Sequence, residues 1–103
     1  IVVDMRFIKN TFYIKELKKL TGKDRKVIKY ISGQINFKNF YKLFLETHKI
    51  IIPAFLTEGK KFLTIAFGCT GGIHRSVMMA EKFSKDIFSK KIEISLEHRD
   101  LKK

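Results

Sequence analysis

Residues 62–76 read Phe62-Leu-Thr-Ile-Ala-Phe-Gly-Cys-Thr-Gly-Gly-Ile-His-Arg-Ser76, an apolar run that leads directly into a glycine-rich loop. Residues 62–67 are typical of a fully buried strand, and residues 68–72 of a tight loop. The apolar positions in residues 74–88 have the spacing of a helix that buries one face. A strand, a loop and a helix in direct succession indicate an α/β fold.

Apolar spacing elsewhere in the chain predicts the remaining elements. Strands are expected at residues 1–7 and 92–96, and helices at residues 14–20, at residues 25–31 after a capping Asp24, and at residues 37–59. The helix at residues 37–59 should kink or break near Pro53, because proline cannot donate a backbone hydrogen bond within a helix. This order implies right-handed crossovers and a small, mostly parallel sheet flanked by helices, in a single domain over residues 1–103. The phenylalanine stripe of the long helix and its His48 are interpreted as core.

The charge balance indicates an anionic partner. The 103 residues contain 22 Lys and Arg against 10 Asp and Glu, which gives a net charge of +12 at pH 7. A single cysteine excludes an internal disulfide framework and fits a reducing, cytoplasmic compartment. No apolar run approaches the roughly 18 residues of a membrane span, and no set of His, Asp and Glu has metal-binding spacing. Neither a membrane nor a metal is therefore expected.

The glycine-rich loop has the composition of an anion site. Its glycines can adopt positive φ and let the backbone approach a ligand: Gly68, Gly71 and Gly72. The free N–H groups and the dipole of the following helix point at the same place. Arg75 adds a planar fork for two phosphate oxygens, and Thr70 and Ser76 add hydroxyl groups. The loop therefore predicts phosphate binding, with a plain turn whose glycines serve only packing as the simpler alternative.

The same residues also fit the phosphate loop of cysteine-dependent phosphatases. Cys69, Gly72, Arg75 and Ser76 satisfy the pattern C-x-x-G-x-x-R-S. In that chemistry the loop lowers the thiol pKa, the thiolate attacks phosphorus, and the arginine stabilises the transferring group. Phosphatase activity is therefore an alternative function, with Cys69 and Arg75 as its catalytic residues.

A phosphatase also needs a carboxylic acid to protonate the leaving oxygen, and Asp4 and Asp100 are the candidates. Two observations weigh against this activity. The phosphatase family usually has histidine where this chain has Gly68, and its domains are generally longer. A Walker A loop is excluded, because the pattern G-x-x-x-x-G-K-[ST] is absent.

Several blocks of the sequence, taken together and in order, closely resemble the C-terminal domain of the RapZ family, bacterial nucleotide-binding proteins that include an RNase adapter. The resemblance covers essentially the whole chain. Its blocks are Val3-Asp4-Met5-Arg6-Phe7 with Asn10, Leu20-Thr21-Gly22 with Asp24, Glu58-Gly59-Lys60, Leu63-Thr64-Ile65-Ala66, Gly68-Cys-Thr-Gly-Gly72, His74-Arg-Ser-Val77, Ala80-Glu81 and His98-Arg99-Asp100-Leu101.

The resemblance implies a fold related to a phosphofructokinase subdomain and binding of glucosamine-6-phosphate. In enteric members it also implies binding of small regulatory RNA. The family's nucleotide site lies in an N-terminal P-loop domain, which is a further expected partner. The N-terminus has no signal-peptide layout and is interpreted as cut from a longer polypeptide. We therefore expect a regulatory binding domain that is not an enzyme, holds no cofactor of its own and can form a homo-oligomer.

Carried over residue by residue, the family's ligand pocket falls on Asp4, Arg6, Asn10, Cys69, Thr70, Gly71, Gly72, His74, Arg75, His98 and Arg99. Asp4 is expected to accept hydrogen bonds from a sugar amine or hydroxyl, and Arg6 with Arg75 to clamp the phosphate. The family often reads P-N-P-[HFY]-[WY] where this chain has Lys9-Asn10-Thr11-Phe12-Tyr13, without either proline. This departure weakens an enteric-type RNA role more than it weakens the anion pocket.

RNA binding through the basic surface is the second hypothesis. Its candidate patch comprises Lys90, Lys91, Arg99, Lys102 and Lys103. Lysines spread over helices are usually a solvated face, whereas three of the four arginines fall in the pocket motifs. The pocket is therefore the firmer prediction.

Overall fold

A computed structural model of the chain describes residues 1–87, 89 and 91–101, without the side chain of Phe12. The elements follow in the order β1 (Val2–Asp4), η1 (Met5–Phe7), η2 (Thr11–Tyr13), α1 (Arg25–Ser32), α2 (Ile35–Thr57), β2 (Ala66–Gly68) and α3 (Arg75–Asp86). The fold is α/β, as the sequence predicts. No helix in these ranges is long and apolar enough to cross a membrane.

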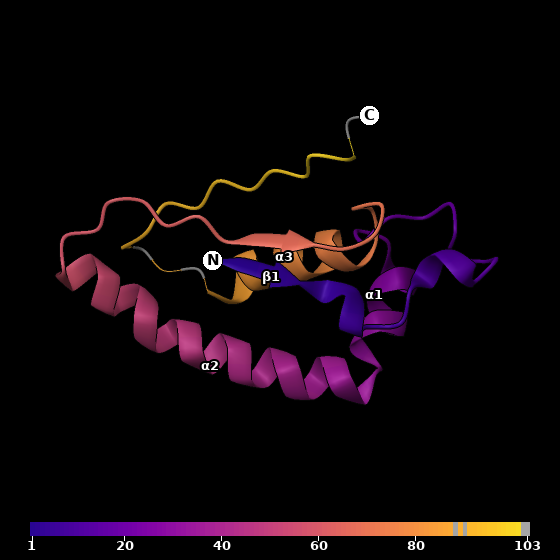
Figure 1. The fold of residues 1–103 in the computed structure, drawn as a ribbon, viewed down its shortest axis with the longest axis horizontal. Helices are drawn as coiled ribbons and strands as arrows, with labels where there is room; N and C mark the ends of the chain where they lie inside the picture. The colour runs from indigo at the N-terminus through magenta and orange to yellow at the C-terminus, as the bar shows by residue number, and fades with distance from the viewer. Residues whose placement is uncertain (88, 90, 102–103) are drawn as a thin grey trace.

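The two strands pair in parallel, which brings their carboxyl ends to one edge of the sheet. Val2 pairs with Ala66, Val3 with Phe67 and Asp4 with Gly68. The short η1 follows β1, and the glycine-rich loop follows β2, so both leave the sheet at the same end (Figure 1). Ligand sites of parallel α/β sheets form at this end.

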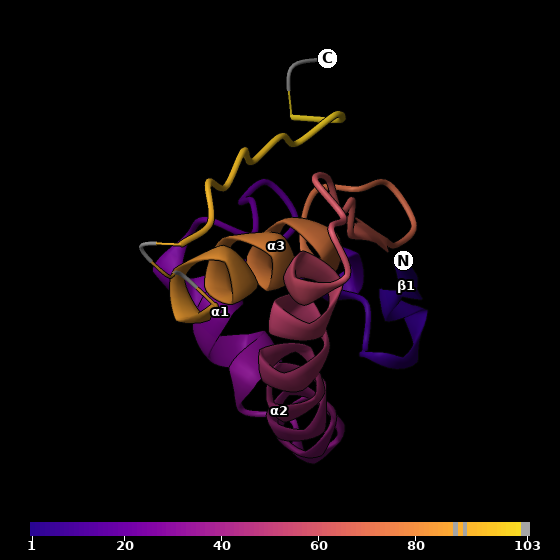
Figure 2. The ribbon, with the colours of Figure 1, turned by 90° about the vertical axis from the view of Figure 1, so that its left-hand side faces the viewer.

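The core lies between the sheet and helices α2 and α3. Phe44 of α2, Phe67 of β2 and Phe83 of α3 meet with ring centroids 5.0 to 5.9 Å apart. The Tyr41 hydroxyl donates to the Asp86 carboxylate and joins α2 to α3. This packing places α3 behind the sheet and α2 along its lower side (Figures 1 and 2). Phe37 is buried and Phe40 and Phe44 pack against the core, as expected, whereas Phe55 at the end of the stripe is exposed.

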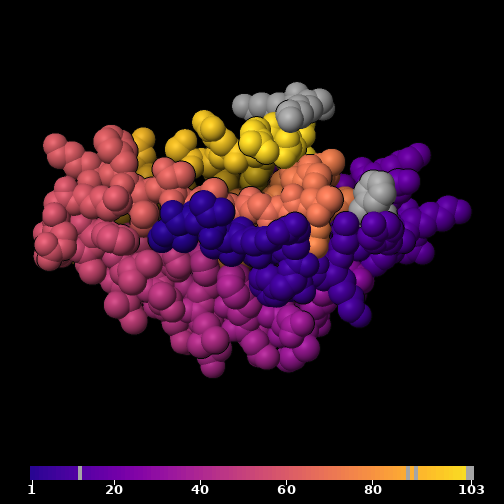
Figure 3. Space-filling model, in the orientation of Figure 1, coloured from indigo at the N-terminus to yellow at the C-terminus, as the bar shows by residue number. Residues whose placement is uncertain are grey.

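The C-terminal segment, residues 91–101, runs on the side of the molecule opposite α2 (Figures 1 and 2). In the space-filling view it lies above the strand β1 (Figure 3). Its far end contacts α3, where His98 Nε2 lies 3.2 Å from Glu81 Oε2. A groove of about 1040 Å³ separates this segment from residues 60–69 and α3.

One helix prediction is wrong, and of the kink or break expected at Pro53 the break does not occur. Residues 14–20 form successive turns, with Leu17 N donating to Ile14 O and Leu20 N to Leu17 O, because the chain must turn here to reach the start of α3. Pro53 does not break α2, which is continuous from Ile35 to Thr57. Pro53 is exposed and, without an N–H group, removes one backbone hydrogen bond. Ile52 beside it packs against the core and keeps the helix in place.

The strand predictions are too long, and one is wrong. Residues 62–65 lie outside β2, and β1 ends at Asp4. The expected full burial of residues 62–67 is also wrong, because Phe62 is 86% exposed and β2 is covered on only one face. Residues 92–96 alternate apolar and polar side chains, yet they form no strand and do not join the sheet. Pairing depends on a partner edge at the right distance, which alternation alone does not supply. Helix α3 ends at Asp86, and the predicted end at Phe88 lies outside the described residues.

Candidate anion-binding site

The glycine-rich loop leaves β2 and enters α3 through two residues with left-handed backbone conformations. Gly71 has φ +83° and Gly72 has φ +66°, as expected, whereas Gly68 ends β2 without positive φ. Residues with a side chain rarely adopt such φ values, so glycine is required at both positions. The loop therefore exposes its backbone at the amino end of α3, where the helix dipole is positive.

The base of the loop is held by the turn at residues 20–22. His74 is buried, and its Nε2 lies 2.6 Å from the carbonyl oxygen of Leu20. Gly22 N donates to Ile73 O at 2.8 Å. A side chain on Gly22 would come closer than 3.0 Å to the backbone of His74 and Met78. His74, which was expected in the ligand pocket, thus supports the loop from inside the fold. The spacing of residues in the sequence does not indicate that the turn at residues 20–22 has this supporting role.

Arg75 is buried beneath the loop, with 4% of its surface exposed. Its Nη1 donates to the carbonyl of Ile8 at 2.7 Å and to that of Arg6 at 3.4 Å, while its buried Nε has no hydrogen-bond partner. No carboxylate in the described part of the chain forms an ion pair with it. Its contacts thus hold the end of η1, a role that its position in the motif does not indicate.

Asp4 and Arg6 form an exposed ion pair at the end of β1. Arg6 Nη2 lies 2.7 Å and Nε 3.0 Å from Asp4 Oδ2, and the Arg6 amide donates to Oδ1, which caps η1. The hydrogen bonds from the Arg6 side chain and amide lower the pKa of Asp4 to about 2, with smaller contributions from the charges of Arg6 and Arg75. Asp4 is therefore a carboxylate whose charge its neighbour already balances.

Cys69 lies at the first turn of the loop, half-buried beside Ser76. Its Sγ lies 3.3 Å from Ser76 Oγ and accepts a hydrogen bond from the Ser76 amide at 3.4 Å. Burial would raise the pKa of the thiol, but the Ser76 hydroxyl, the amides of Ser76 and Gly72 and the charge of Arg75 together lower it. The loop therefore stabilises negative charge at the position of this sulfur.

The structure brings part of the predicted site into one shallow pocket of about 340 Å³. It is lined by Val2, Val3, Asp4, Arg6, Gly68, Cys69 and Thr70. His98, Arg99, Gly72 and Ser76 line the larger groove on the other side of the loop, where Cys69 is common to both. Four further residues expected in the pocket line neither of the two: Asn10, Gly71, His74 and Arg75.

The predicted RNA patch is described only in part. Lys91 and Arg99 are exposed, with Arg99 88% exposed, whereas Lys90, Lys102 and Lys103 lie outside the described residues. Among the residues that the structure describes, no three His, Cys, Asp or Glu side chains are grouped as a metal site would need. The chemistry of the site is therefore that of backbone amides, guanidinium groups and a thiol.

Comparison with known proteins places these features in a family context. A family model described as the RapZ C-terminal domain matches residues 1–102. A nucleotide-binding protein of Limosilactobacillus reuteri is 47% identical over 103 residues, which cover 100% of this chain and 36% of that protein. One of Lactobacillus gasseri is 46% identical over 101 residues, which cover 98% of this chain and 34% of that protein. The chain spans about a third of the length of the curated relatives it matches.

Proposed function

Because this chain belongs to the family of RapZ C-terminal domains, we propose that it is a regulatory domain that binds a phosphorylated amino sugar of the glucosamine-6-phosphate class. The phosphate binds at the glycine-rich loop, and the domain does not turn its ligand over. In a longer protein its partner in the same chain is an N-terminal P-loop domain.

The observation that carries this proposal is the electrostatic environment of Arg75. Arg75 is 4% exposed and has no carboxylate ion-pair partner among the described residues, so its guanidinium leaves positive potential that an anion can balance. Its charge already acts on Asp4 and Cys69, which both line the shallow pocket. The amides of Gly72 in the loop and of Ser76 at the amino end of α3 point to the Cys69 sulfur, where they favour negative charge.

Thermal unfolding of the chain with three ligands tests this function. Glucosamine-6-phosphate and inorganic phosphate should both raise the melting temperature, whereas glucosamine, which lacks the phosphate, should not. At a ligand concentration 100 times its Kd the stabilisation is about 2.7 kcal/mol, or roughly 10–20 °C for a domain of this size. Equal shifts with glucosamine and its phosphate would contradict the proposal.

Two arginine variants locate the binding to the site. Arg6→Gln removes an exposed charge from the pocket and should reduce the ligand-induced shift without changing the unliganded melting temperature by more than about 2 °C. Arg25→Gln removes the same charge from the exposed surface of α1 and serves as the matched control. If both variants reduce the shift equally, only the net charge matters and the pocket is not the site.

RNA binding is a second activity that we propose, and the exposed cations around α1 support it. These cations lie in residues 15–29, and the turn at Gly22 within that range contacts the glycine-rich loop. The positive charge of the loop therefore continues onto α1. A gel-shift titration over salt should give a slope of about −0.7 per phosphate contacted on single strands. Absence of a complex at low salt would remove this activity. The cations, all exposed, are Lys15, Lys18, Lys19, Lys23, Arg25, Lys26 and Lys29.

Cysteine-dependent phosphatase activity remains the alternative, and the lowered pKa of Cys69 is the observation that favours it. Arg75 argues against it, because its Nη1 is bonded to main-chain carbonyls. Incubation with an aryl phosphate separates the two functions. Turnover that is lost in Cys69→Ser would establish the enzyme and overturn the proposal of a binding domain, and turnover that survives Cys69→Ser would exclude the cysteine mechanism.

A further inference from the structure

The outer edge of β2 has main-chain groups that no described residue pairs with. On the inner side, Ile1 N donates to Thr64 O at 3.0 Å, and Ala66 N donates to Ile1 O at 2.8 Å. Successive residues of a strand point their N–H and C=O groups to opposite sides. The main-chain groups of Ile65 and Phe67 therefore point away from β1, and within the described part of the chain they form no hydrogen bond.

This edge lines the groove of about 1040 Å³ between residues 60–69, α3 and the C-terminal segment. Small-molecule pockets measure about 300–1,000 Å³, so the groove has room for a longer, extended ligand. Large apolar side chains that the fold leaves exposed gather along it, and such a cluster is typical of an interaction site. They are Phe55, Leu56, Phe62, Ile94 and Leu96, with Phe62 86% exposed.

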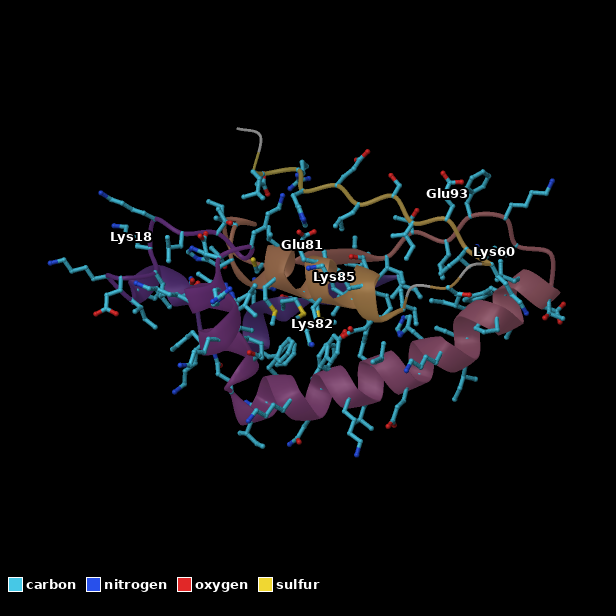
Figure 4. All side chains as sticks on the ribbon, turned by 180° about the vertical axis from the view of Figure 1, so that it is seen from behind. Lys18, Lys60, Glu81, Lys82, Lys85 and Glu93 are labelled. Carbon is cyan, nitrogen blue, oxygen red and sulfur yellow. The ribbon has the colours of Figure 1, made fainter. Side chains whose placement is uncertain are left out.

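Three lysines that line the groove carry charge that no carboxylate balances. Lys60, Lys61 and Lys91 are exposed, and none of them forms an ion pair within the described ranges. Two unpaired glutamates also line the groove, Glu93 and Glu97, and Glu93 lies at the same end of the molecule as Lys60 (Figure 4). The lysines outnumber them, and the whole chain carries a charge of +12. The groove therefore attracts an acidic ligand.

We propose that the groove binds an extended, acidic segment of another protein, which adds a strand to the outer edge of β2. The main chain of this segment pairs with Ile65 and Phe67, and every second side chain enters the groove. In strand addition the main-chain hydrogen bonds supply affinity, whereas the pockets for alternate side chains supply specificity. This interaction does not depend on phosphate binding at the glycine-rich loop.

A synthetic peptide of sequence Asp-Val-Thr-Val-Thr-Val-Asp tests the surface, because it alternates apolar and polar residues and is acidic at both ends. A fluorescent label on the peptide reports binding to the wild-type chain by anisotropy. Proline in place of the central valine and of the threonine after it removes donors on both edges of the peptide, and lysine in place of both aspartates reverses its charge. Each change should weaken binding at least about tenfold. No binding of the first peptide, or equal binding of all three, would overturn the proposal.

Amide hydrogen exchange resolved by NMR identifies the edge at which the peptide binds. The peptide should slow exchange of the Ile65 and Phe67 amides at least about tenfold, whereas the Ala66 amide, already bonded to Ile1 O, should change little. Binding without this alternation would overturn strand addition. Protection of Ile65 and Phe67 before peptide is added would show that the chain's own C-terminal segment or a second copy occupies the edge, and would also overturn the proposal.

Two exposed aromatic residues give a matched pair of variants. Phe62→Thr removes an 86% exposed ring from the groove and should weaken peptide binding about fivefold, while its melting temperature stays within about 3 °C of wild type. Tyr13→Thr removes an 84% exposed ring that does not line the groove, and it should leave peptide binding unchanged. Equal effects of the two variants would show that the groove is not the binding surface.

Discussion

The turn at Gly22 leaves no room for a side chain, and alanine at this position tests how the loop is braced. An added Cβ would come closer than 3.0 Å to His74 O and Met78 N, and 2.9 Å from Val77 Cβ. Two of these atoms are backbone at the start of α3 and cannot rotate away. The turn must therefore move outward and lose the 2.8 Å hydrogen bond from Gly22 N to Ile73 O. Overpacking and one lost hydrogen bond together cost about 3 kcal/mol.

A loss of about 3 kcal/mol lowers the melting temperature of a domain of this size by roughly 10–20 °C. Differential scanning calorimetry of Gly22→Ala measures it. Gly68→Ala is the control, because a Cβ there meets no atom within 4 Å and φ is not positive, so its melting temperature should stay within about 3 °C of wild type. A fall of less than 3 °C for Gly22→Ala would refute the close approach of this turn to α3.

Three further predictions concern the charged groups of the site. Arg75→Lys removes the Nη1 group that donates to two carbonyls and should reduce stability by about 1–3 kcal/mol in urea unfolding, and an unchanged midpoint would contradict those bonds. Ser76→Ala removes a hydroxyl that lowers the pKa of Cys69, so alkylation of the thiol should need a higher pH; an identical rate–pH profile would show that Ser76 has no such effect. The Asp4 carboxyl should titrate near pH 2 by NMR, and Arg6→Gln should raise this pKa toward 3.8. Because the folded pKa is lowered, the stabilisation by this pair is present above about pH 4 and is lost as the pH falls toward 2.

The strand–loop–helix unit was predictable because its signals are local. An apolar run, two glycines that adopt positive φ and an apolar helical face lie next to one another in residues 62–86. The long helix α2 was predictable for the same reason, since its stripe recurs over more than five turns. Pro53 misled the prediction because the cost of one lost hydrogen bond is local, whereas the packing of Ile52 that offsets it is tertiary.

The direction of buried side chains could not be predicted from the motif. His74 and Arg75 occupy the positions expected of phosphate ligands, yet His74 contacts Leu20 and Arg75 contacts Ile8, which lie more than 50 residues away in sequence. No spacing rule relates such distant positions. The prediction of a third strand was wrong for the same reason. Residues 92–96 have the alternation of a strand, but they do not pair with an edge of the two-stranded sheet. Interactions between distant segments decided all three outcomes.

A phosphate bound at the loop as proposed would compete with Cys69 for the same donors, and this competition would favour binding over chemistry. The sulfur accepts from the Ser76 amide and is stabilised by the Gly72 amide and the charge of Arg75, which are the groups that an anion at the loop needs. A phosphate that takes these donors removes what lowers the thiol pKa, and its negative charge raises that pKa further. A ligand bound in this way would therefore favour the protonated thiol, which is a poor nucleophile. By linkage, the same coupling makes phosphate bind more weakly as the pH rises through the pKa of Cys69, because the thiolate must first be protonated.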